Sequence, residues 1–158
     1  MNISLRLNGT PVDVDVPPHW TLLRTLRDRL GQTDVKHGCG EGVCGACTVL
    51  LDGVAVNGCL VLAVQADGGD IETVASLADG DTLHPLQQEL VERGAVQCGF
   101  CTPGMVLGAL EATRIGAAGD RAEIRRSLAG NLCRCTGYTT IVDAVEAYQQ
   151  RVASEVLP

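Results

Sequence analysis

Eight cysteines constrain what this chain can fold into more than any other feature of its sequence. They fall into two groups of four, one in each half of the chain. The groups are Cys39, Cys44, Cys47 and Cys59, and Cys98, Cys101, Cys133 and Cys135. Four thiolates close together in space are what an iron–sulfur cluster requires. We therefore expect the fold to bring four thiols together twice, as in a protein that carries electrons.

The length and charge of the chain exclude several other classes of protein. Its 158 residues suit one domain or two small ones. The net charge is −7, and there are neither basic runs nor interleaved aromatic residues, so we expect no nucleic-acid partner. The N-terminus shows no secretory signal, and no apolar run approaches the roughly 20 residues that span a bilayer. We therefore expect a cytoplasmic protein with no membrane partner.

Four disulfide bonds are the alternative use of eight cysteines. Disulfides are uncommon in a reducing cytosol, where clustered cysteines more often bind metal or act in redox chemistry. These cysteines also lie too close together for the framework of a secreted domain. Metal binding is therefore favoured.

The first cysteine group lies mostly on one glycine-rich loop. Its spacing, C-x4-C-x2-C followed by a later cysteine, is that of plant-type ferredoxins, which bind a [2Fe–2S] cluster. Four glycines let the backbone adopt positive φ angles and bring N–H groups close to sulfur. They are Gly38, Gly40, Gly42 and Gly45. Structural zinc is the alternative, but its usual paired elements fit this loop less well. His37 is expected to be a surface or partner-facing residue, because four cysteines already complete the coordination.

Each cysteine pair of the second group is expected to lie just before a helix. Thr102 followed by Pro103 is typical of a helix N-terminus. Thr139 or Thr140 can cap the next helix. Helix N-termini carry partial positive charge and free N–H groups, so they favour an anionic cluster, and Arg134 adds a full positive charge. The spacing C-x2-C with C-x-C is also tolerable for zinc, which stays the alternative here.

The first half of the sequence predicts strands around one helix. Apolar and polar residues alternate around Asn8-Gly9, a two-residue hairpin signal, and a second such turn is expected at Asp52-Gly53. Thr21 can cap a helix that Gly31 ends. The expected strands cover residues 3–7, 12–16, 48–51, 54–57 and 71–74, and the expected helix covers residues 22–30. This order of elements indicates a β-grasp arrangement.

The second half predicts helices only. Helical patterns occur near residues 85–93, 104–113, 121–129 and 141–152, which implies a four-helix bundle. The segment from Ser76 to Leu83 is the expected linker. We therefore expect an α+β chain with two domains. Residues 1–77 would form a β-grasp, ferredoxin-like [2Fe–2S] domain, and residues 78–158 a four-helix-bundle [2Fe–2S] domain.

Three segments together resemble the signatures of the small iron–sulfur subunit of the molybdenum hydroxylases, the family of xanthine dehydrogenase, aldehyde oxidase and carbon monoxide dehydrogenase. The segments are Gly38–Cys47 (GCGEGVCGAC), Gln97–Met105 (QCGFCTPGM) and Gly130–Tyr138 (GNLCRCTGY). The resemblance covers nearly the whole chain and implies the same two domains, each with one cluster. One departure is Gly58, which stands where the family commonly has serine.

The resemblance also implies partner subunits with further cofactors. The helical-domain cluster would lie beside a molybdopterin, carried as a dinucleotide by a large subunit, and the other cluster would lie nearer FAD in a medium subunit. The subunits would form a heterotrimer, or a dimer of heterotrimers. Gln97 is expected to hydrogen-bond the pterin, and Cys135 to lie beside it. For Gln97 the alternative is a buried amide that satisfies the loop backbone.

We therefore expect the electron-transfer subunit of an oxidoreductase that hydroxylates a heteroaromatic compound, a purine or an aldehyde, or oxidises carbon monoxide. Electrons would pass singly from molybdenum through both clusters to FAD or another acceptor. No substrate site is expected here, because the chain has no serine-nucleophile motif and no phosphate-binding loop. The alternatives are a free-standing ferredoxin-like carrier and a zinc-stabilised interaction module. Phe100, Met105 and Tyr138 are expected in the core, with contact to a partner as the alternative.

Overall fold

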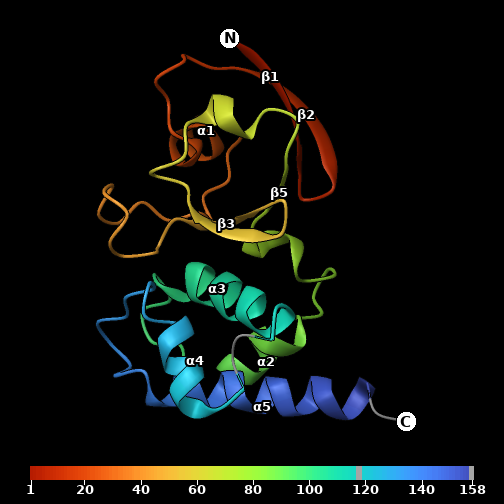
Figure 1. Cartoon of the computed structure of the whole chain (residues 1–158), viewed down its shortest axis with the longest axis vertical. Coiled ribbons are helices and arrows are strands. Elements are labelled where there is room, and N and C mark those ends of the chain that lie inside the picture. Colours follow the sequence, from red (N-terminus) through yellow and green to blue (C-terminus); the bar gives the residue numbers. More distant parts are fainter. Residues whose placement is uncertain (117–118, 157–158) are drawn as a thin grey trace.

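The computed structural model describes residues 1–116 and 119–156. The first half of the chain forms a sheet with a helix, and the second half forms helices only. The two parts are stacked in Figure 1, with the N-terminus at the sheet end and the C-terminus at the helical end. The α+β class predicted from the sequence is therefore confirmed.

The first hairpin forms where Asn8-Gly9 predicts it. Its strands β1 (Asn2–Leu7) and β2 (Thr10–Asp15) pair antiparallel. Asn8 and Gly9 have φ angles of 50° and 79°, the left-handed conformations that a type I′ turn needs at both positions. Side chains along β1 alternate between exposed and buried, so one face of the hairpin packs on the core.

The strands form one mixed sheet with the order β2-β1-β5-β3-β4. β3 (Thr48–Leu51) and β4 (Val54–Asn57) make the second predicted hairpin. A 3₁₀ turn, η1 (Ala63–Ala66), precedes β5 (Asp70–Glu72). β5 lies in the centre of the sheet, parallel to β1 and antiparallel to β3, and thereby joins the two hairpins.

The last strand is displaced from its predicted position. The sequence predicts a strand over residues 71–74, but the chain leaves the sheet after Glu72 and forms the 3₁₀ turn η2 (Val74–Ser76). The cause is Thr73, whose N–H donates to Asn8 Oδ1 at 2.8 Å and whose hydroxyl accepts a backbone N–H two residues further on at 3.3 Å. These local hydrogen bonds compete with the sheet ladder and turn the chain towards the helices.

Helix α1 (Leu22–Asp28) packs against the sheet. Thr21 Oγ1 accepts a backbone N–H of the first turn at 3.2 Å, so Thr21 caps the helix as predicted. Leu22 and Leu26 are fully buried in the core. The helix ends two residues earlier than predicted, and Gly31, with a φ angle of 68°, then turns the chain.

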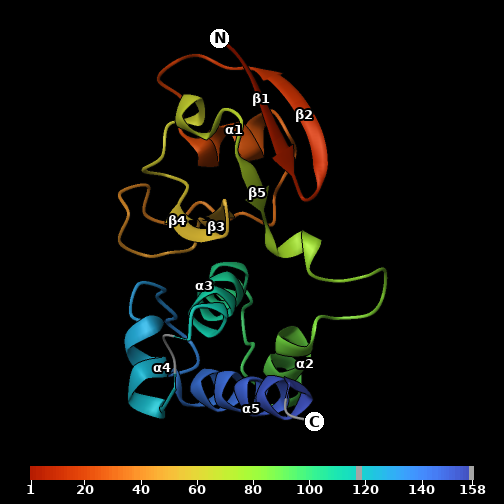
Figure 2. The same cartoon turned by 45° about the vertical axis from the view of Figure 1, so that its right-hand side comes forward.

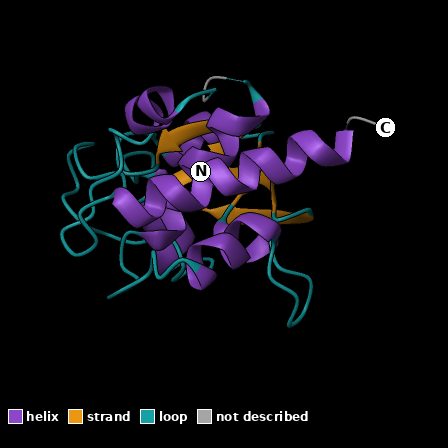
Figure 3. Cartoon of the chain, turned by 90° about the horizontal axis from the view of Figure 1, so that it is seen from below, coloured by secondary structure: helices purple, strands orange, loops and turns teal. Residues whose placement is uncertain are grey.

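The four helices predicted in the second half are all present. They are α2 (Pro85–Glu92), α3 (Thr102–Arg114), α4 (Arg121–Ser127) and α5 (Thr139–Val156). α5 is longer than predicted and runs across the end of the molecule furthest from the sheet (Figures 1 and 3). Thr102 is wrongly predicted as a cap: Cys101 holds the cap position, and its carbonyl accepts the N–H of Met105 at 3.0 Å. No helix in the described residues has the length and hydropathy needed to cross a lipid bilayer.

Each half has its own hydrophobic core. The first contains apolar side chains of the strands, α1 and η1, and the second contains those of the helices. α3 contacts β3 and β4 and lies directly beneath β3 in Figure 1. The connection between η2 and α2 loops away from both halves (Figure 2). The contact between the halves is therefore made mainly by α3.

Leu26→Ala should strongly destabilise the protein. Leu26 is fully buried between α1 and the sheet, so truncation removes contacts and leaves a cavity, at a cost of about 2–5 kcal/mol in the free energy of unfolding. Urea unfolding followed by circular dichroism measures the change. Leu83→Ala is the control, because Leu83 is 44% exposed in the linker and should change stability by less than about 0.5 kcal/mol. Equal losses in both variants would contradict this packing.

Candidate metal centres

Cys39 and Cys44 of the first group lie on a loop between α1 and β3 that folds around its own sulfur atoms. Cys39 Sγ accepts the backbone N–H groups of Glu41 (3.4 Å), Val43 (3.3 Å) and Cys44 (3.4 Å). The N–H of Cys39 in turn donates to Cys44 Sγ at 3.3 Å. Gly40 has a φ angle of 74°, a conformation open to glycine that helps the loop to wrap this tightly. The loop therefore presents backbone donors to sulfur.

The other two cysteines of this group are buried behind the loop. Cys47 and Cys59 are 3% and 7% exposed, and their side chains interact with each other. Gly58 fixes the position of Cys59, because its N–H donates to Cys47 O at 3.2 Å and its carbonyl accepts the N–H of Leu23 at 2.8 Å. A Cβ atom at Gly58 would lie 3.2 Å from Cys47 O, so a larger residue would require the neighbours to adjust.

The two sides of this site differ in how they treat a thiolate. Backbone N–H groups, that of Glu41 above all, lower the pKa of Cys39 to about 6. Burial raises the pKa of Cys47 to about 12, with a contribution from the neighbouring Cys59 thiol. Metal ligation deprotonates cysteines. Cys39, on the exposed side, already favours the thiolate, whereas Cys47, on the buried side, would lose its proton only when a metal cation binds.

The second cysteine group joins two loops that are far apart in the sequence. Cys98 and Cys101 lie between α2 and α3, whereas Cys133 and Cys135 lie between α4 and α5. Cys98 Sγ and Cys135 Sγ are 3.6 Å apart, and this contact raises the pKa of Cys135. Cys101 interacts with both Cys133 and Cys98. The structure therefore brings these four thiols together.

Hydrogen bonds orient Cys133 within the second site. The Thr136 hydroxyl donates to Cys133 Sγ at 3.2 Å, and the Cys133 N–H donates to the Tyr138 hydroxyl at 2.8 Å. Burial acts to raise the pKa of Cys133, but donors at Thr136 and Cys135 outweigh it and lower that pKa to about 7. Burial raises the pKa of Cys101 to about 12, and the Cys133 thiol adds to the effect. This site therefore also combines a side that favours thiolate with a side that does not.

Helix N-termini border the second site, as the sequence predicts. Cys101 is the cap residue of α3, and α5 begins at Thr139, shortly after Cys135. The first turn of a helix carries partial positive charge and unpaired N–H groups, which favour the negative charge of a thiolate-bound cluster. Arg134 is exposed between two of the cysteines and adds a full positive charge.

The donor sets fit [2Fe–2S] clusters better than single metal ions. Each set contains four neighbouring thiols with N–H or O–H donors on sulfur, which stabilise the negative charge of a cluster. Zinc draws its ligands to one point, about 2.3 Å from each sulfur. In the described part of the chain, no group of three or more His, Cys, Asp or Glu side chains is arranged to hold a metal ion. The hydrogen-bond donors on sulfur are what suits the negative charge of a thiolate-bound cluster.

Two polar residues singled out in the sequence lie at the surface. Gln97 is exposed, and its amide has no hydrogen-bonding partner among the described residues. The alternative of a buried amide is therefore wrong. His37 is also exposed, as expected of a surface or partner-facing residue.

Apolar side chains are exposed on the loops that carry the cysteines. Met105 is buried in the second core and Tyr138 packs against it, but Phe100 is 47% exposed, contrary to its prediction as a core residue. Phe100 stands between two cysteines whose thiols meet their partners, so its ring is left outside. We call the exposed apolar residues next to the cysteines the apolar rim: Val43, Leu60, Leu62, Val96, Phe100 and Leu132. Each lies within three residues of a cysteine, a sequence signal that periodicity does not detect.

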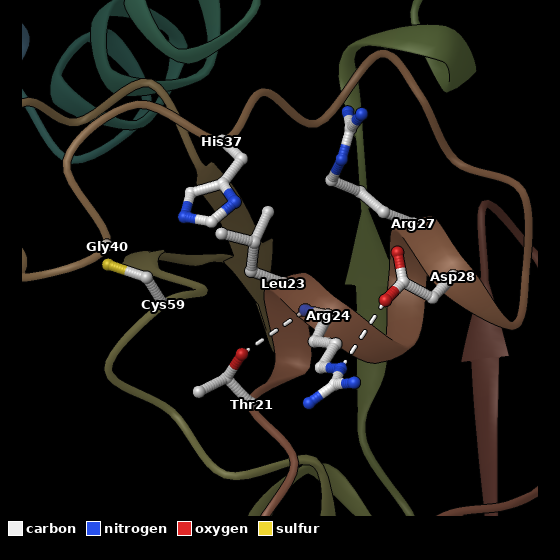
Figure 4. Close-up of a pocket in the computed structure, with 8 residues that line it drawn as sticks. All are labelled: Thr21, Leu23, Arg24, Arg27, Asp28, His37, Gly40 and Cys59. Carbon is white, nitrogen blue, oxygen red and sulfur yellow. Dashed lines mark hydrogen bonds and ion pairs between the residues drawn. The ribbon is translucent and has the colours of Figure 1, made fainter.

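A pocket of about 460 Å³ opens beside Cys59, between α1 and the first cysteine loop (Figure 4). Arg24, Arg27 and His37 line it together with Asp28, which pairs with Arg24 at 3.4 Å. Arg27 is held by backbone carbonyls, one of them at 2.6 Å, and not by a carboxylate in the described residues. Positive charge therefore gathers at this edge of an otherwise acidic chain.

Alkylation of the cluster-free chain should distinguish the two sides of the first site. Cys39, with its pKa lowered to about 6, is largely thiolate at pH 7, whereas Cys47, with its pKa raised to about 12, stays protonated. Iodoacetamide should therefore label Cys39 much faster, with a rate that rises as the pH passes about 6. Mass spectrometry of the peptides measures both rates, and in denatured chain, the control, they should converge. Equal rates in the folded chain would refute this assignment.

The same lowered pKa has a consequence for stability. Because the folded pKa of Cys39 lies below its ordinary value of 9.0, its thiolate stabilises the folded cluster-free chain fully above pH 9. That contribution is lost as the pH falls through about 6.

Comparisons with known sequences cover both halves of the chain. A family described as a 2Fe-2S iron-sulfur cluster binding domain matches residues 5–78, and one described as a [2Fe-2S] binding domain matches residues 73–146. The nicotine 6-hydroxylase small subunit of Paenarthrobacter nicotinovorans is 47% identical over 145 residues, which cover 92% of this chain and 87% of that protein. The xanthine dehydrogenase iron-sulfur-binding subunit of Escherichia coli O157:H7 is 46% identical over 151 residues and 92% of each chain.

Solved structures share the fold along the whole chain. A chain of quinoline 2-oxidoreductase from Pseudomonas putida 86 matches with a TM-score of 0.93 and 44% identity, over 99% of this chain and 97% of that one. The aldehyde oxidoreductase of Desulfovibrio desulfuricans ATCC 27774 matches with a TM-score of 0.92 and 39% identity, over 98% of this chain and 17% of that longer one. Together with the two cluster-binding domains, these matches show that the chain belongs to the family of small iron–sulfur subunits that transfer electrons in the molybdenum hydroxylases.

Proposed function

We propose that this subunit carries electrons one at a time from a molybdopterin centre to FAD or another acceptor. One [2Fe–2S] cluster would be bound by Cys98, Cys101, Cys133 and Cys135, and the other by Cys39, Cys44, Cys47 and Cys59. The observation that carries the proposal is the meeting of four thiols at each of two sites, with hydrogen-bond donors on sulfur. When bound, each cluster supplies one-electron redox chemistry.

The chain's own residues position the clusters and tune their charge. The N–H groups around Cys39 and the Thr136 hydroxyl at Cys133 stabilise negative charge on sulfur, and so favour the reduced state of each cluster. The apolar rim would exclude water from each cluster once a partner subunit covers it. Substrate chemistry is assigned to a partner, since no substrate site is expected on this chain.

We further propose that the chain divides into a β-grasp domain at residues 1–77 and a four-helix-bundle domain at residues 78–158. The separate cores of the two halves support this division. The matched family segments, which overlap only at residues 73–78, support a boundary in that region. Val74 and Leu77 already pack against the helical core, so the end of the first domain would form part of the contact with the second.

The large molybdopterin-binding subunit would dock on the helical site, the site formed by the second cysteine group. Cys98 and Cys135 are exposed there, together with Phe100 of the apolar rim. Gln97 presents a free amide beside them, and we propose that it hydrogen-bonds the pterin while Cys135 lies next to that cofactor. An exposed amide among exposed apolar side chains suits recognition of a polar heterocycle brought by a partner.

The FAD-binding medium subunit would dock on the sheet-side site, the site formed by the first cysteine group. Cys39 is exposed there, Val43 and Leu60 belong to the apolar rim, and the pocket with Arg24 and Arg27 adds positive charge. We propose a heterotrimer, or a dimer of heterotrimers, in the cytoplasm, where a reducing environment preserves eight thiols. A relative from Paenarthrobacter nicotinovorans, 45% identical, is itself named a subunit of a dehydrogenase complex.

The names of the relatives support a class of substrate for the assembled enzyme. Nicotine, xanthine and quinoline, named in three of the matches, are nitrogen heteroaromatic compounds, and another match is an aldehyde oxidoreductase. We propose a nitrogen heteroaromatic compound, or an aldehyde, as the substrate, with the oxygen of the product taken from water.

Two measurements separate this function from its rivals. A zinc-stabilised interaction module would be colourless, whereas [2Fe–2S] protein is red-brown and absorbs visible light. A free-standing ferredoxin-like carrier would purify alone, whereas a hydroxylase subunit purifies with its partners. A colourless protein, or a coloured one that never co-purifies with a molybdopterin subunit from its native cells, would overturn the proposal.

Cys98→Ser should remove or alter one cluster only. The helical site would lose a thiolate, whereas the sheet-side site has a separate set of ligands on another loop. Electron paramagnetic resonance of the reduced wild-type chain should show two distinct signals, and the variant should retain the sheet-side signal while electron flow from molybdenum stops. Cys39→Ser is the reciprocal control and should retain the other signal. Loss of both signals in either variant would show that the two sites are not independent.

Gln97→Ala should leave both clusters intact and weaken the molybdenum side. The substitution removes an exposed amide that bonds to nothing in the described chain, so the fold should not change. Molybdenum content of the purified complex and its turnover should fall, while both cluster signals persist. Gln88→Ala is the matched control, because Gln88 is exposed on α2 and its side chain bonds only Glu92 among the described residues, at 2.8 Å. Wild-type molybdenum content and turnover in Gln97→Ala would refute the assigned role.

A further inference from the structure

A hydrogen-bonded joint connects the two cysteine loops. The N–H of Leu132, next to Cys133, donates to the carbonyl of Cys44 at 2.9 Å. This bond joins residues 88 positions apart and links a cysteine of the first site to the neighbour of a cysteine of the second. The two sites therefore approach each other through their ligand loops, and not only through the helix α3 that lies between the halves.

The buried side chain of Asn131 adds hydrogen bonds to this joint. Its side chain is 7% exposed, and both N–H bonds of its amide are available as donors. Asn131 Nδ2 donates to Gly45 O at 3.0 Å and to Thr48 Oγ1 at 3.1 Å, and the Thr48 hydroxyl donates to the same Gly45 carbonyl at 2.7 Å. A side chain of the second loop thus fixes the backbone directly between Cys44 and β3.

Glycines let the two cysteine loops and α3 approach one another closely enough for these hydrogen bonds. A Cβ atom at Gly45 would collide with Gly130 O, and one at Gly104 would collide with Gly45 O. A Cβ atom at Gly108, on α3, would lie 2.8 Å from Asn131 Oδ1. Gly45 also has a φ angle of 66°, which disfavours any side chain. Side chains at these three positions would push the loops apart, so the glycines keep the two loops and α3 in close contact.

We propose that Asn131 is a positioning residue for electron transfer between the two clusters: it fixes their separation and relative orientation. The rate of electron transfer falls steeply with distance, and the cysteine loops have no regular secondary structure to set that distance. The inference rests on the proposed function, because both cysteine groups must bind clusters for it to apply. It adds a role to a residue that binds neither cluster.

Other contacts between the halves do not replace this joint. Glu111 Oε1 on α3 accepts the N–H of Ala55 on β4 at 3.0 Å, and Arg114 pairs with Glu72 at 3.5 Å. Neither contact involves a cysteine or its direct neighbour, and both hold the sheet to the helix. They should keep the halves together when Asn131 is changed, so a variant of Asn131 should shift the loops locally without separating the domains.

The test is Asn131→Asp in the assembled enzyme. Aspartate has the shape of asparagine but lacks both amide N–H donors, and its carboxylate would face the Gly45 carbonyl. When both clusters are reduced, their paramagnetic centres couple magnetically, and the coupling depends on separation and orientation. Electron paramagnetic resonance should therefore show a changed splitting, while iron content and the individual signals of both clusters stay as in wild type. Stopped-flow reduction by substrate should show the sheet-side cluster reduced several-fold more slowly than in wild type, with reduction of the helical-site cluster unchanged.

Glu111→Gln is the matched control, since it weakens a bond between the halves that does not touch the cysteine loops, and it should leave both the splitting and the rate unchanged. If Asn131→Asp lowers thermal stability but keeps the wild-type splitting and rate, the role of Asn131 is structural and the inference fails. If Asn131→Asp does not fold, Thr48→Val decides: it keeps the shape and removes two of the hydrogen bonds, so unchanged splitting and rate overturn the inference, and a smaller shift in both supports it. Absence of two cluster signals in wild type would instead overturn the proposed function.

Discussion

Stabilising negative charge on sulfur is the requirement on which the rest of this structure depends. In the proposed function, eight thiols serve as thiolates in a chain whose own net charge is −7. The counterbalance is local: backbone N–H groups surround Cys39, a hydroxyl bonds Cys133, and helix N-termini border the second site. Hydrogen-bond donors and helix dipoles act over short distances, so the loops must wrap closely around sulfur.

The two halves meet this requirement by different means. On the sheet side, one glycine-rich loop supplies three cysteines, and the β3–β4 hairpin brings the fourth, Cys59, back to it. On the helical side, two loops meet only because α3 and α5 pack in one core. The first site is thus mostly a local property of the backbone, whereas the second depends on the packing of the whole bundle.

Local rules account for the parts of the fold that the sequence predicts well. The hairpin at Asn8-Gly9, the cap at Thr21 and the positions of the helices follow from backbone preferences and periodicity. The cysteine spacing likewise predicts which thiols are grouped. Two of the wrong predictions depend on a partner that is distant in the sequence or on the positions that neighbouring residues already occupy. Thr73 ends β5 through Asn8, 65 residues away, and Phe100 is exposed because the cysteines beside it face their partners.

The same reasoning explains why Asn131 is not evident from sequence patterns. An asparagine before a cysteine is typical of a turn, and nothing local indicates that its amide reaches Gly45, 86 residues earlier. Its importance becomes visible only when the glycines on both sides of the joint are seen to leave room for it. Sequence reasoning therefore proposes the ligands, whereas the contact between their loops through Asn131 is visible only in the structure.

The apolar rim affects how the subunit behaves before it binds its partners. Side chains such as Leu60, Phe100 and Leu132 surround the sites where the clusters are nearest to solvent. An unassembled subunit would expose apolar surface and oxidisable sulfur at the same places, so it would be prone to both aggregation and oxidation there. Synthesis in matched amounts with its partners protects against both hazards at once, and an excess of this subunit would be a burden to the cell that makes it.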